Sequence, residues 1–514
     1  MEAISKKVFL SLKMPDEHAP ISDAARIKLA LDSLGYNPVS IPLSVLKKLY
    51  PLCRNADFDI TVTMVRREWD WVLTEVEAGD TTKQHFGLAV DYGSTTIIMQ
   101  LVDLNSGAVL CEEKRINGQT EFGTDILTRI TYAMEDPYHK EDLHQATIDT
   151  FRNLLDAVTE ATGIQAAKCP VMILSGNTTM IHFLLKLDAW TVFASPYAPV
   201  TSDPGFFWGG ELGIPFEGQV YIIPAASNYV GGDIVSGLLT LDMHRHEKTS
   251  LFFDIGTNGE LVLGNKEWMI AGAGAAGPAL EGYISHYGMR AAPGAIDKVK
   301  ISDGRISYTT IGNRKPVGIC GSGIIDLLAQ MRLNGWINMA GHLNPDTTDR
   351  IVYLQDENQY AAVYAKAEES ESGKPLYFTQ TDIDQYLDTK AAAFTMIECI
   401  LDSAGITEKQ VDKCYLSGAF PAHSDLEAAI TIGIFPDLPR EKYQMIANTS
   451  LEGARILLTN RDRLEEMREL LENMYCVQFA SVPDFLIRMQ AAKFIPHTDM
   501  DRFPTIAERL NKEP

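Results

Sequence analysis

The chain has 514 residues and the composition of an ordinary globular protein. A chain of this length is too long to fold around a single hydrophobic core, so we expect two to four domains. The formal net charge of −23 argues against nucleic acid or an anionic membrane as a partner. We find neither an apolar run of membrane-spanning length nor a signal-peptide core, so we expect a cytoplasmic protein.

Residues 1–84 carry both helix and strand patterns and are predicted to form a small α+β domain. Ser22 is typical of a helix N-cap, Gly35 of a helix end, and Pro51 should end a second, short helix. The predicted elements are strands over 8–12, 59–65 and 71–76 and helices over 23–34 and 44–50. No pattern here points to catalysis, so we expect a docking or dimerisation module. A homodimer is the commonest assembly and is our expectation.

An acidic turn after the first strongly apolar strand is the first candidate site, and it opens a lobe predicted over residues 85–250. Apolar residues 86–90 and 97–102 flank this turn, which is typical of two buried strands. Asp91, at the strand end, can hold a Mg²⁺ ion that bridges to a phosphate. Amides and small hydroxyls in such a turn form an anion cradle, here from Gly93, Ser94, Thr95 and Thr96.

Three polar positions in the first lobe each allow two interpretations. Asp125 and Arg129 stand at i and i+4, so we favour an ion pair, and a catalytic base is the alternative for Asp125. Asn177 belongs to the segment 175–179 at a predicted strand end, which can line a ligand cleft or cap the following helix, and both roles can hold. His182, among apolar residues, is expected to be a satisfied core residue rather than a ligand contact. The stretch 196–210 is predicted to be a surface loop.

Gly231, Gly232 and Asp233 stand at the start of a helix predicted over residues 228–239. The glycines permit close helix packing or a hinge. Asp233 is either an acid at a helix N-terminus or a residue that reaches Mg²⁺ through water. All three are candidate ligand-binding residues.

A second acidic turn opens a lobe predicted over residues 251–449. Apolar residues 251–253 lead into Asp254, the second candidate Mg²⁺ ligand, and residues 261–263 follow the turn. The second phosphate cradle is predicted from Gly256, Thr257, Asn258 and Gly259. Because the unit strand–turn–strand–turn–strand occurs twice, the chain is predicted to contain two related lobes. Residues from about 450 to 514 are expected to rejoin the first lobe.

Five motifs together resemble those of the reductive activators of corrinoid proteins, in the actin, sugar kinase and Hsp70 ATPase superfamily. They are Gly231–Asp233, Asp254–Glu260, Ala275–Gly282, Gly318–Gly323 and Ser417–Phe420. The resemblance extends from about Lys6 to the C-terminus. It implies an α/β fold of two RNase H-like lobes with a nucleotide cleft, in which both acidic turns bind MgATP. It also implies that an adenosine lies against Gly418, Ala419 and Phe420.

The resemblance further implies ATP-dependent reactivation of a corrinoid protein of a methyltransferase system, in which Co(II) returns to Co(I). Such activators usually carry an iron–sulfur cluster, which requires closely spaced cysteines. The cysteines of this chain are far apart: Cys53, Cys111, Cys169, Cys320, Cys399, Cys414 and Cys476. We therefore predict no iron–sulfur cluster and an electron supply in trans, for example from a separate ferredoxin.

Two other functions remain open on the same fold. A small-molecule kinase would need an acidic base, for which Asp125 or Asp233 would serve. A nucleotide-sensing scaffold would bind ATP without turnover.

Overall fold

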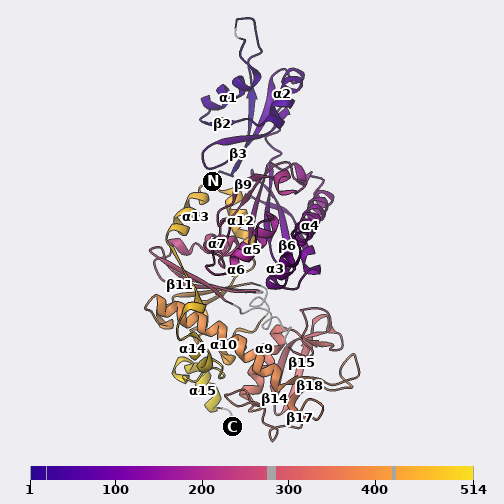
Figure 1. Cartoon of the computed structure of the whole chain (residues 1–514), viewed down its shortest axis with the longest axis vertical. Coiled ribbons are helices and arrows are strands. Elements are labelled where there is room, and N and C mark those ends of the chain that lie inside the picture. Colours follow the sequence, from indigo (N-terminus) through magenta and orange to yellow (C-terminus); the bar gives the residue numbers. More distant parts are fainter. Residues whose placement is uncertain (1, 19, 257, 275–284, 419–423, 513–514) are drawn as a thin grey trace. The chain divides into compact units, whose positions relative to one another are not determined.

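The computed structural model describes residues 2–18, 20–256, 258–274, 285–418 and 424–512, and the chain divides into two compact units (Figure 1). Unit 1 comprises Met1–Asp242 and Thr449–Asn473, and unit 2 comprises Met243–Asn448 and Met474–Pro514. The segment 450–514, expected to rejoin the first lobe as a whole, is therefore divided after Asn473. None of the helices within the described ranges combines the length and the apolar character that a membrane crossing requires.

The N-terminal part of unit 1 is a four-stranded sheet with two helices. The strands, in the order β1-β3-β4-β2, are β1 (Ser5–Ser11), β3 (Asp59–Arg66), β4 (Trp71–Ala78) and β2 (Val39–Ser40), and the helices are α1 (Asp23–Ser33) and α2 (Leu43–Asn55). Ser22 caps α1 by accepting a hydrogen bond from the Ala25 amide, as predicted. The prediction that Pro51 ends the second helix is wrong, because α2 continues to Asn55. Burial of Leu49 and Cys53 on one face offsets the hydrogen bond that Pro51 cannot make.

The rest of unit 1 contains a six-stranded sheet. In the order β7-β6-β5-β8-β10-β9, its strands are β7 (Val109–Ile116), β6 (Thr96–Asp103), β5 (Phe86–Tyr92), β8 (Val171–Gly176), β10 (Gln219–Ile222) and β9 (Gly205–Trp208). The central strands β5 and β8 are almost continuously apolar, as expected of strands covered on both faces. Strand β9 lies inside the segment 196–210, predicted to be a surface loop. It pairs with β10, and Trp208 lies opposite Gln219. The loop prediction is therefore wrong for the C-terminal part of that segment.

Seven helices accompany this sheet in the described residues of unit 1: α3 (Ile126–Glu135), α4 (His139–Thr162), α5 (Thr178–Leu184), α6 (Trp190–Phe193), α7 (Gly232–Leu241), α12 (Thr449–Thr459) and α13 (Arg463–Glu472). Helix α4 ends at Gly163, whose positive φ of 73° closes the helix. Helices α7 and α12 pack against each other, and α12 also packs on β5 and β8.

Unit 2 contains a second six-stranded sheet and two small ones. The large sheet, in the order β21-β20-β11-β12-β13-β22, consists of β21 (Tyr443–Met445), β20 (Lys413–Ser417), β11 (Ser250–Ile255), β12 (Gly259–Gly264), β13 (Met269–Gly274) and β22 (Met474–Val477). The small sheets contain β14 (Ala295–Ser302), β15 (Arg305–Thr310) and β16 (Gly318–Ile319), and β17 (Ile351–Leu354), β18 (Gln359–Ala365) and β19 (Leu376–Thr379). The helices in the described residues of this unit are α9 (Gly321–Leu333), α10 (Gln380–Ser403), α11 (Leu426–Ile432), α14 (Phe485–Ala492) and α15 (Pro504–Lys512).

The two large sheets repeat one arrangement of five strands. In unit 1, β5, β6 and β7 are successive antiparallel neighbours, and β5, β8 and β10 are successive parallel neighbours. In unit 2, β11, β12 and β13 are likewise successive antiparallel neighbours, and β11, β20 and β21 are successive parallel neighbours. Even the register agrees, because Asp91 lies opposite Ser175 and Asp254 lies opposite Ser417. The internal repeat that the two turns suggested therefore extends through the sheets.

Candidate functional site

The first acidic turn is held in shape by contacts from within unit 1. A Cβ atom added at Gly93 would lie 2.5 Å from the Thr96 carbonyl oxygen, so the turn requires glycine. Asn117 fastens the turn, since its side-chain amide donates to the Gly93 carbonyl (3.0 Å) and its backbone amide to the Thr95 carbonyl (2.9 Å). Ser94, Thr95 and Thr96 are half-buried, and their hydroxyls make no hydrogen bond within the described part of the chain. They are therefore available to a ligand.

Asp91 is the half-buried carboxylate beside this turn. Its Oδ1 accepts a hydrogen bond from Ser450 Oγ at 2.8 Å. Ser450 lies on α12, and it also contacts Ser175 at the end of β8 (2.9 Å). A carboxylate fixed at a strand end next to an anion cradle is a donor group suited to Mg²⁺.

Gly231 and Gly232 sit where α7 begins against β8 and the end of β10. A Cβ atom at Gly231 would lie 2.8 Å from Asn177 Cα, and one at Gly232 would lie 2.5 Å from the Ile223 carbonyl oxygen. These distances support the close-packing interpretation of the two glycines. Asp233, in the first turn of α7, is half-buried, and its Oδ1 accepts a hydrogen bond from the Ile234 amide at 3.0 Å.

The second acidic turn lies at the equivalent place in unit 2. Asp254 is half-buried near the end of β11, and the Gly256 amide donates to the Asn258 carbonyl at 2.9 Å across the turn. Glu260, which is 6% exposed, lies opposite Asp254 on β12. Residues opposite each other in an antiparallel pair project to the same face, so two carboxylates meet beside this turn. Thr257 lies outside the described residues.

Gly418 follows the strand end beside Asp254. Its φ is +100°, and an added Cβ atom would lie 2.7 Å from the Ile255 carbonyl carbon, so only glycine fits. Gly176 has the corresponding place in unit 1, where an added Cβ atom would lie 3.0 Å from the Tyr92 carbonyl oxygen. Ala419 and Phe420, expected to lie against adenosine, fall outside the described residues.

The structure shows the hydrogen-bond partners of the three polar residues that allowed two interpretations. Asp125 caps α3, with its carboxylate accepting from the Thr128 amide (2.8 Å) and hydroxyl (2.7 Å). Arg129 instead donates to the Gly123 carbonyl (2.9 Å), so the expected ion pair is replaced by a helix cap. Asn177 likewise caps α5 through the Thr179 amide. His182 is a satisfied core residue, as predicted: its ring nitrogens contact the Thr178 carbonyl and the Val200 amide.

Glu260 and Ser450 were not among the predicted site residues, and Ser175 was named only as part of the segment 175–179 that can line a cleft. A sequence signal existed for one of them, because the tripeptide Leu-Ser-Gly occurs at 174–176 and again at 416–418. No local pattern marks Ser450, which is far from Asp91 in the sequence.

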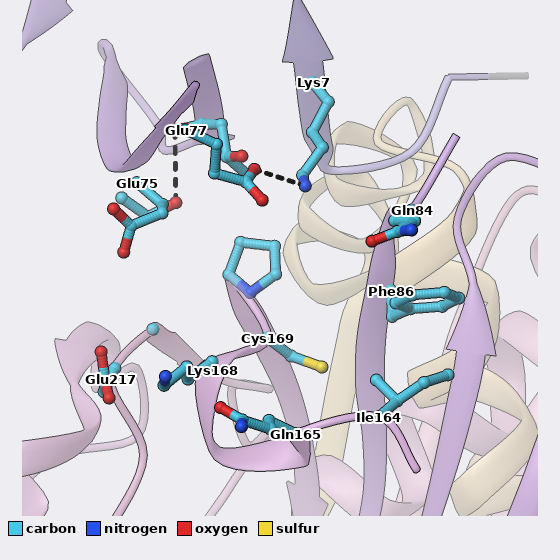
Figure 2. A pocket seen from close by; sticks show the side chains of 14 residues that line it. Lys7, Glu75, Glu77, Gln84, Phe86, Ile164, Gln165, Lys168, Cys169 and Glu217 are labelled. Carbon is cyan, nitrogen blue, oxygen red and sulfur yellow. Dashed lines mark hydrogen bonds and ion pairs between the residues drawn. The ribbon is translucent and has the colours of Figure 1, made fainter. Parts of the chain in front are cut away.

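A separate cavity of about 300 Å³ lies at the other end of β5 (Figure 2). Figure 2 shows the ion pair between Lys7 and Glu77 (2.5 Å) on one side and Cys169 on the other. Phe86, the first residue of β5, lines the cavity; Asp91 is five residues further along, about 17 Å at the usual rise of a strand. Burial raises the pKa of the Cys169 thiol to about 12, so this cysteine is unreactive at neutral pH. All seven cysteines are free thiols.

The repeated sheets and their paired acidic turns define a mixed α/β protein with an actin/Hsp70-like, or ASKHA, ATPase domain. A family model described as the C-terminal domain of RACo, the ASKHA domain, matches residues 248–507. Models of the RACo middle region and the RACo linker region match residues 86–246 and 1–83. The chain belongs to the RACo family.

Three relatives are similar over most of the chain. A solved structure of a reductive activator for a corrinoid, iron–sulfur protein has 35% sequence identity and a TM-score of 0.86, covering 98% of this chain and 81% of that one. The corrinoid activation enzyme RamQ of Eubacterium limosum is 29% identical over 423 residues, which is 81% of this chain and 71% of RamQ. A [Co(II) methylated amine-specific corrinoid protein] reductase of Methanosarcina barkeri is 24% identical, over 76% of this chain and 73% of that protein.

Proposed function

We propose that this protein is an ATP-dependent activator that returns the cobalt of a corrinoid protein from Co(II) to Co(I). The observation that carries the proposal is the match to RACo models along nearly the whole chain, together with the 35% identity to a reductive activator over 98% of it. The substrate named for the Methanosarcina relative is a methylated amine-specific corrinoid protein. We therefore assign a corrinoid protein of a methyltransferase system as the substrate.

The two acidic turns are the proposed nucleotide-binding elements, one in each of two RNase H-like lobes. The Gly93 turn fits an anion, because its backbone is fixed by Asn117 and its three hydroxyls are available. Asp91 and Asp254 would hold Mg²⁺, and the second cradle would comprise Gly256, Thr257, Asn258 and Gly259. Bound MgATP supplies the free energy of phosphate-bond hydrolysis. Gly231, Gly232, Asp233, Gly418, Ala419 and Phe420 complete the proposed nucleotide contacts.

In this proposal the protein makes the reduction of Co(II) to Co(I) thermodynamically more favourable. Co(II) gains one electron to become Co(I), and the electron comes from a low-potential donor in trans, such as a ferredoxin. A tenfold preference for one oxidation state shifts a one-electron potential by about 59 mV. An activator that bound the Co(I) form of its substrate about 10⁴-fold more tightly would therefore raise the potential by roughly 240 mV.

Phosphate release tests this proposal against the two other functions. We expect the corrinoid protein to stimulate MgATP hydrolysis by the native chain. Asp91→Asn and Asp254→Asn should each lower the stimulated rate by about 100-fold or more, because each removes a charge assigned to the metal. Asp125→Asn is the matched control, since its carboxylate caps α3, and it should stay within about threefold of the native rate.

The other outcomes identify the alternatives. Transfer of the γ-phosphate to a small hydroxyl or carboxylate compound without the corrinoid protein would establish a kinase. Binding of ATP with no hydrolysis in the presence of any corrinoid protein would establish a scaffold. Either result would refute the activator proposal.

A further inference from the structure

Three serine hydroxyls form a chain that ends on Asp91. Ser236 of α7 lies 2.8 Å from Ser175 of β8, Ser175 lies 2.9 Å from Ser450 of α12, and Ser450 lies 2.8 Å from Asp91 Oδ1. Ser175 and Ser236 are fully buried, and Ser450 is 9% exposed. Four separate elements of unit 1 thus meet through short contacts behind the first acidic turn.

The carboxylate fixes the direction of the hydrogen bonds nearest to it. An ionised aspartate only accepts, and a serine hydroxyl carries one proton. Ser450 must therefore donate to Asp91, and in its contact with Ser175 it can only accept. The single proton of Ser175 has two acceptors, the Ser450 hydroxyl at 2.9 Å and the Gly232 carbonyl at 3.2 Å. The bond from Ser450 to Asp91 is thus fixed in direction, and a hydrogen bond to a charged group is among the stronger ones.

Ser450 also stands where the chain returns to unit 1. The chain leaves this unit after Asp242, just past the end of α7, and re-enters at Thr449, the first residue of α12. Thr240 donates to the Thr449 carbonyl (2.9 Å). Arg463 donates to the Leu239 carbonyl and to the Asp242 carboxylate, both at 2.6 Å. The Thr240 bond fixes the start of α12 against the end of α7, and the Arg463 bonds fix the start of α13 at the same end of α7. Ser450, the second residue of α12, is therefore held beside the points where the chain leaves unit 1 after Asp242 and re-enters it at Thr449.

We propose that Ser450 is a positioning residue for Asp91, which it orients toward Mg²⁺ and connects to two of the three places where the chain passes between its units, those after Asp242 and before Thr449. The inference rests on the role given to Asp91 in the proposed function, and it adds a residue through which that carboxylate is held. Groups that hydrogen-bond a metal-ligating carboxylate typically contribute about 10- to 100-fold to metal affinity.

The test measures binding of a fluorescent, non-hydrolysable ATP analogue to the full chain as the Mg²⁺ concentration is raised. Ser450→Ala should raise the half-saturating Mg²⁺ concentration by about 10- to 100-fold. Ser450→Cys keeps the shape of the side chain with a slightly larger atom and a weak S–H donor, and should have an intermediate effect. Ser236→Ala is the matched control: Ser236 is also buried and also contacts Ser175, but it does not touch Asp91, and its variant should stay within about threefold of the native protein. Melting curves establish that each variant is folded.

A double-mutant cycle separates positioning from a general structural role. Asp91→Asn should itself raise the Mg²⁺ requirement, and adding Ser450→Ala to it should have almost no further effect. An equal effect of Ser450→Ala with and without Asp91, or no effect in the native background, would overturn the inference. Because the readout is Mg²⁺-dependent nucleotide binding, it is independent of cobalt reduction. A positive result here with no Co(I) formation would refute the activator proposal and leave the positioning role standing.

Discussion

Replacing Gly453 by alanine would place a methyl group inside the contact between α12 and α7. The added Cβ atom would lie 2.5 Å from both the carbonyl carbon and the Cβ atom of Ser236, and closer still to the Ser236 carbonyl oxygen. The backbone atoms of a helix cannot move away from the clash as the end of a flexible side chain can. The two helices must therefore separate by about 1 Å to accommodate the methyl group. Overpacking of this kind costs about 3 kcal/mol. For a unit of this size, that corresponds to a fall in the melting temperature of roughly 6–12 °C.

Thermal unfolding followed by circular dichroism measures this loss, and hydrogen exchange of peptides from α7 and α12 locates it. Gly210→Ala is the matched control, because an added Cβ atom there meets nothing within 4 Å. We expect the control to change stability by less than about 0.5 kcal/mol. If Gly453→Ala melts within 2 °C of the native protein with unchanged exchange in both helices, the close contact argued from the structure is refuted.

The remaining predictions concern single side chains. Burial lowers the pKa of His85 to about 4, below the value near 6.5 of an unfolded chain, so the unfolded state binds more protons between these pH values. Unfolding free energy should therefore fall as the pH drops from about 6.5 to 4, by up to about 3 kcal/mol for this group, and His85→Gln should remove that part of the pH dependence in denaturant titrations. Maleimide at pH 7 should modify the half-buried Cys111 and Cys476 in the native protein, whereas the buried Cys169 should react only after unfolding. Burial raises the pKa of the Cys111 thiol as well, so Cys111 should react more slowly than a free thiol. Rapid labelling of Cys169 in the native protein would contradict its burial. Asp125→Ala should cost about 1 kcal/mol in stability, and a loss of ATP turnover beyond tenfold would show that the carboxylate does more than cap a helix.

Local signals in the sequence predicted the elements around both turns. Strands β5, β6, β11 and β12 are apolar runs next to small residues, and Ser22 and Gly163 mark helix ends through their own backbone chemistry. Such features depend on neighbours in the chain, so they are readable from it. The cap at Asp125 was also readable, because Thr128 follows three residues later, but the spacing to Arg129 suggested an ion pair instead.

Other features depend on contacts between distant parts of the chain. Helix α2 continues past Pro51 because Leu49 and Cys53 pack into a core formed by other elements. Strand β9 has only four residues and exists through its pairing with β10. Ser450 reaches Asp91 from a helix that the chain forms only after completing most of unit 2. No local pattern encodes these contacts, so the residues behind the site emerge only from the fold.

The most direct test of the activator account is an absorption spectrum. A corrinoid protein held as Co(II) is mixed with a low-potential reductant, with this protein, and with or without MgATP. The account predicts that the Co(I) spectrum appears only when protein and MgATP are both present, and that Asp254→Asn abolishes it. Co(I) formed equally without MgATP, or by Asp254→Asn at the native rate, would contradict the claim that the acidic turns and their nucleotide drive the reduction.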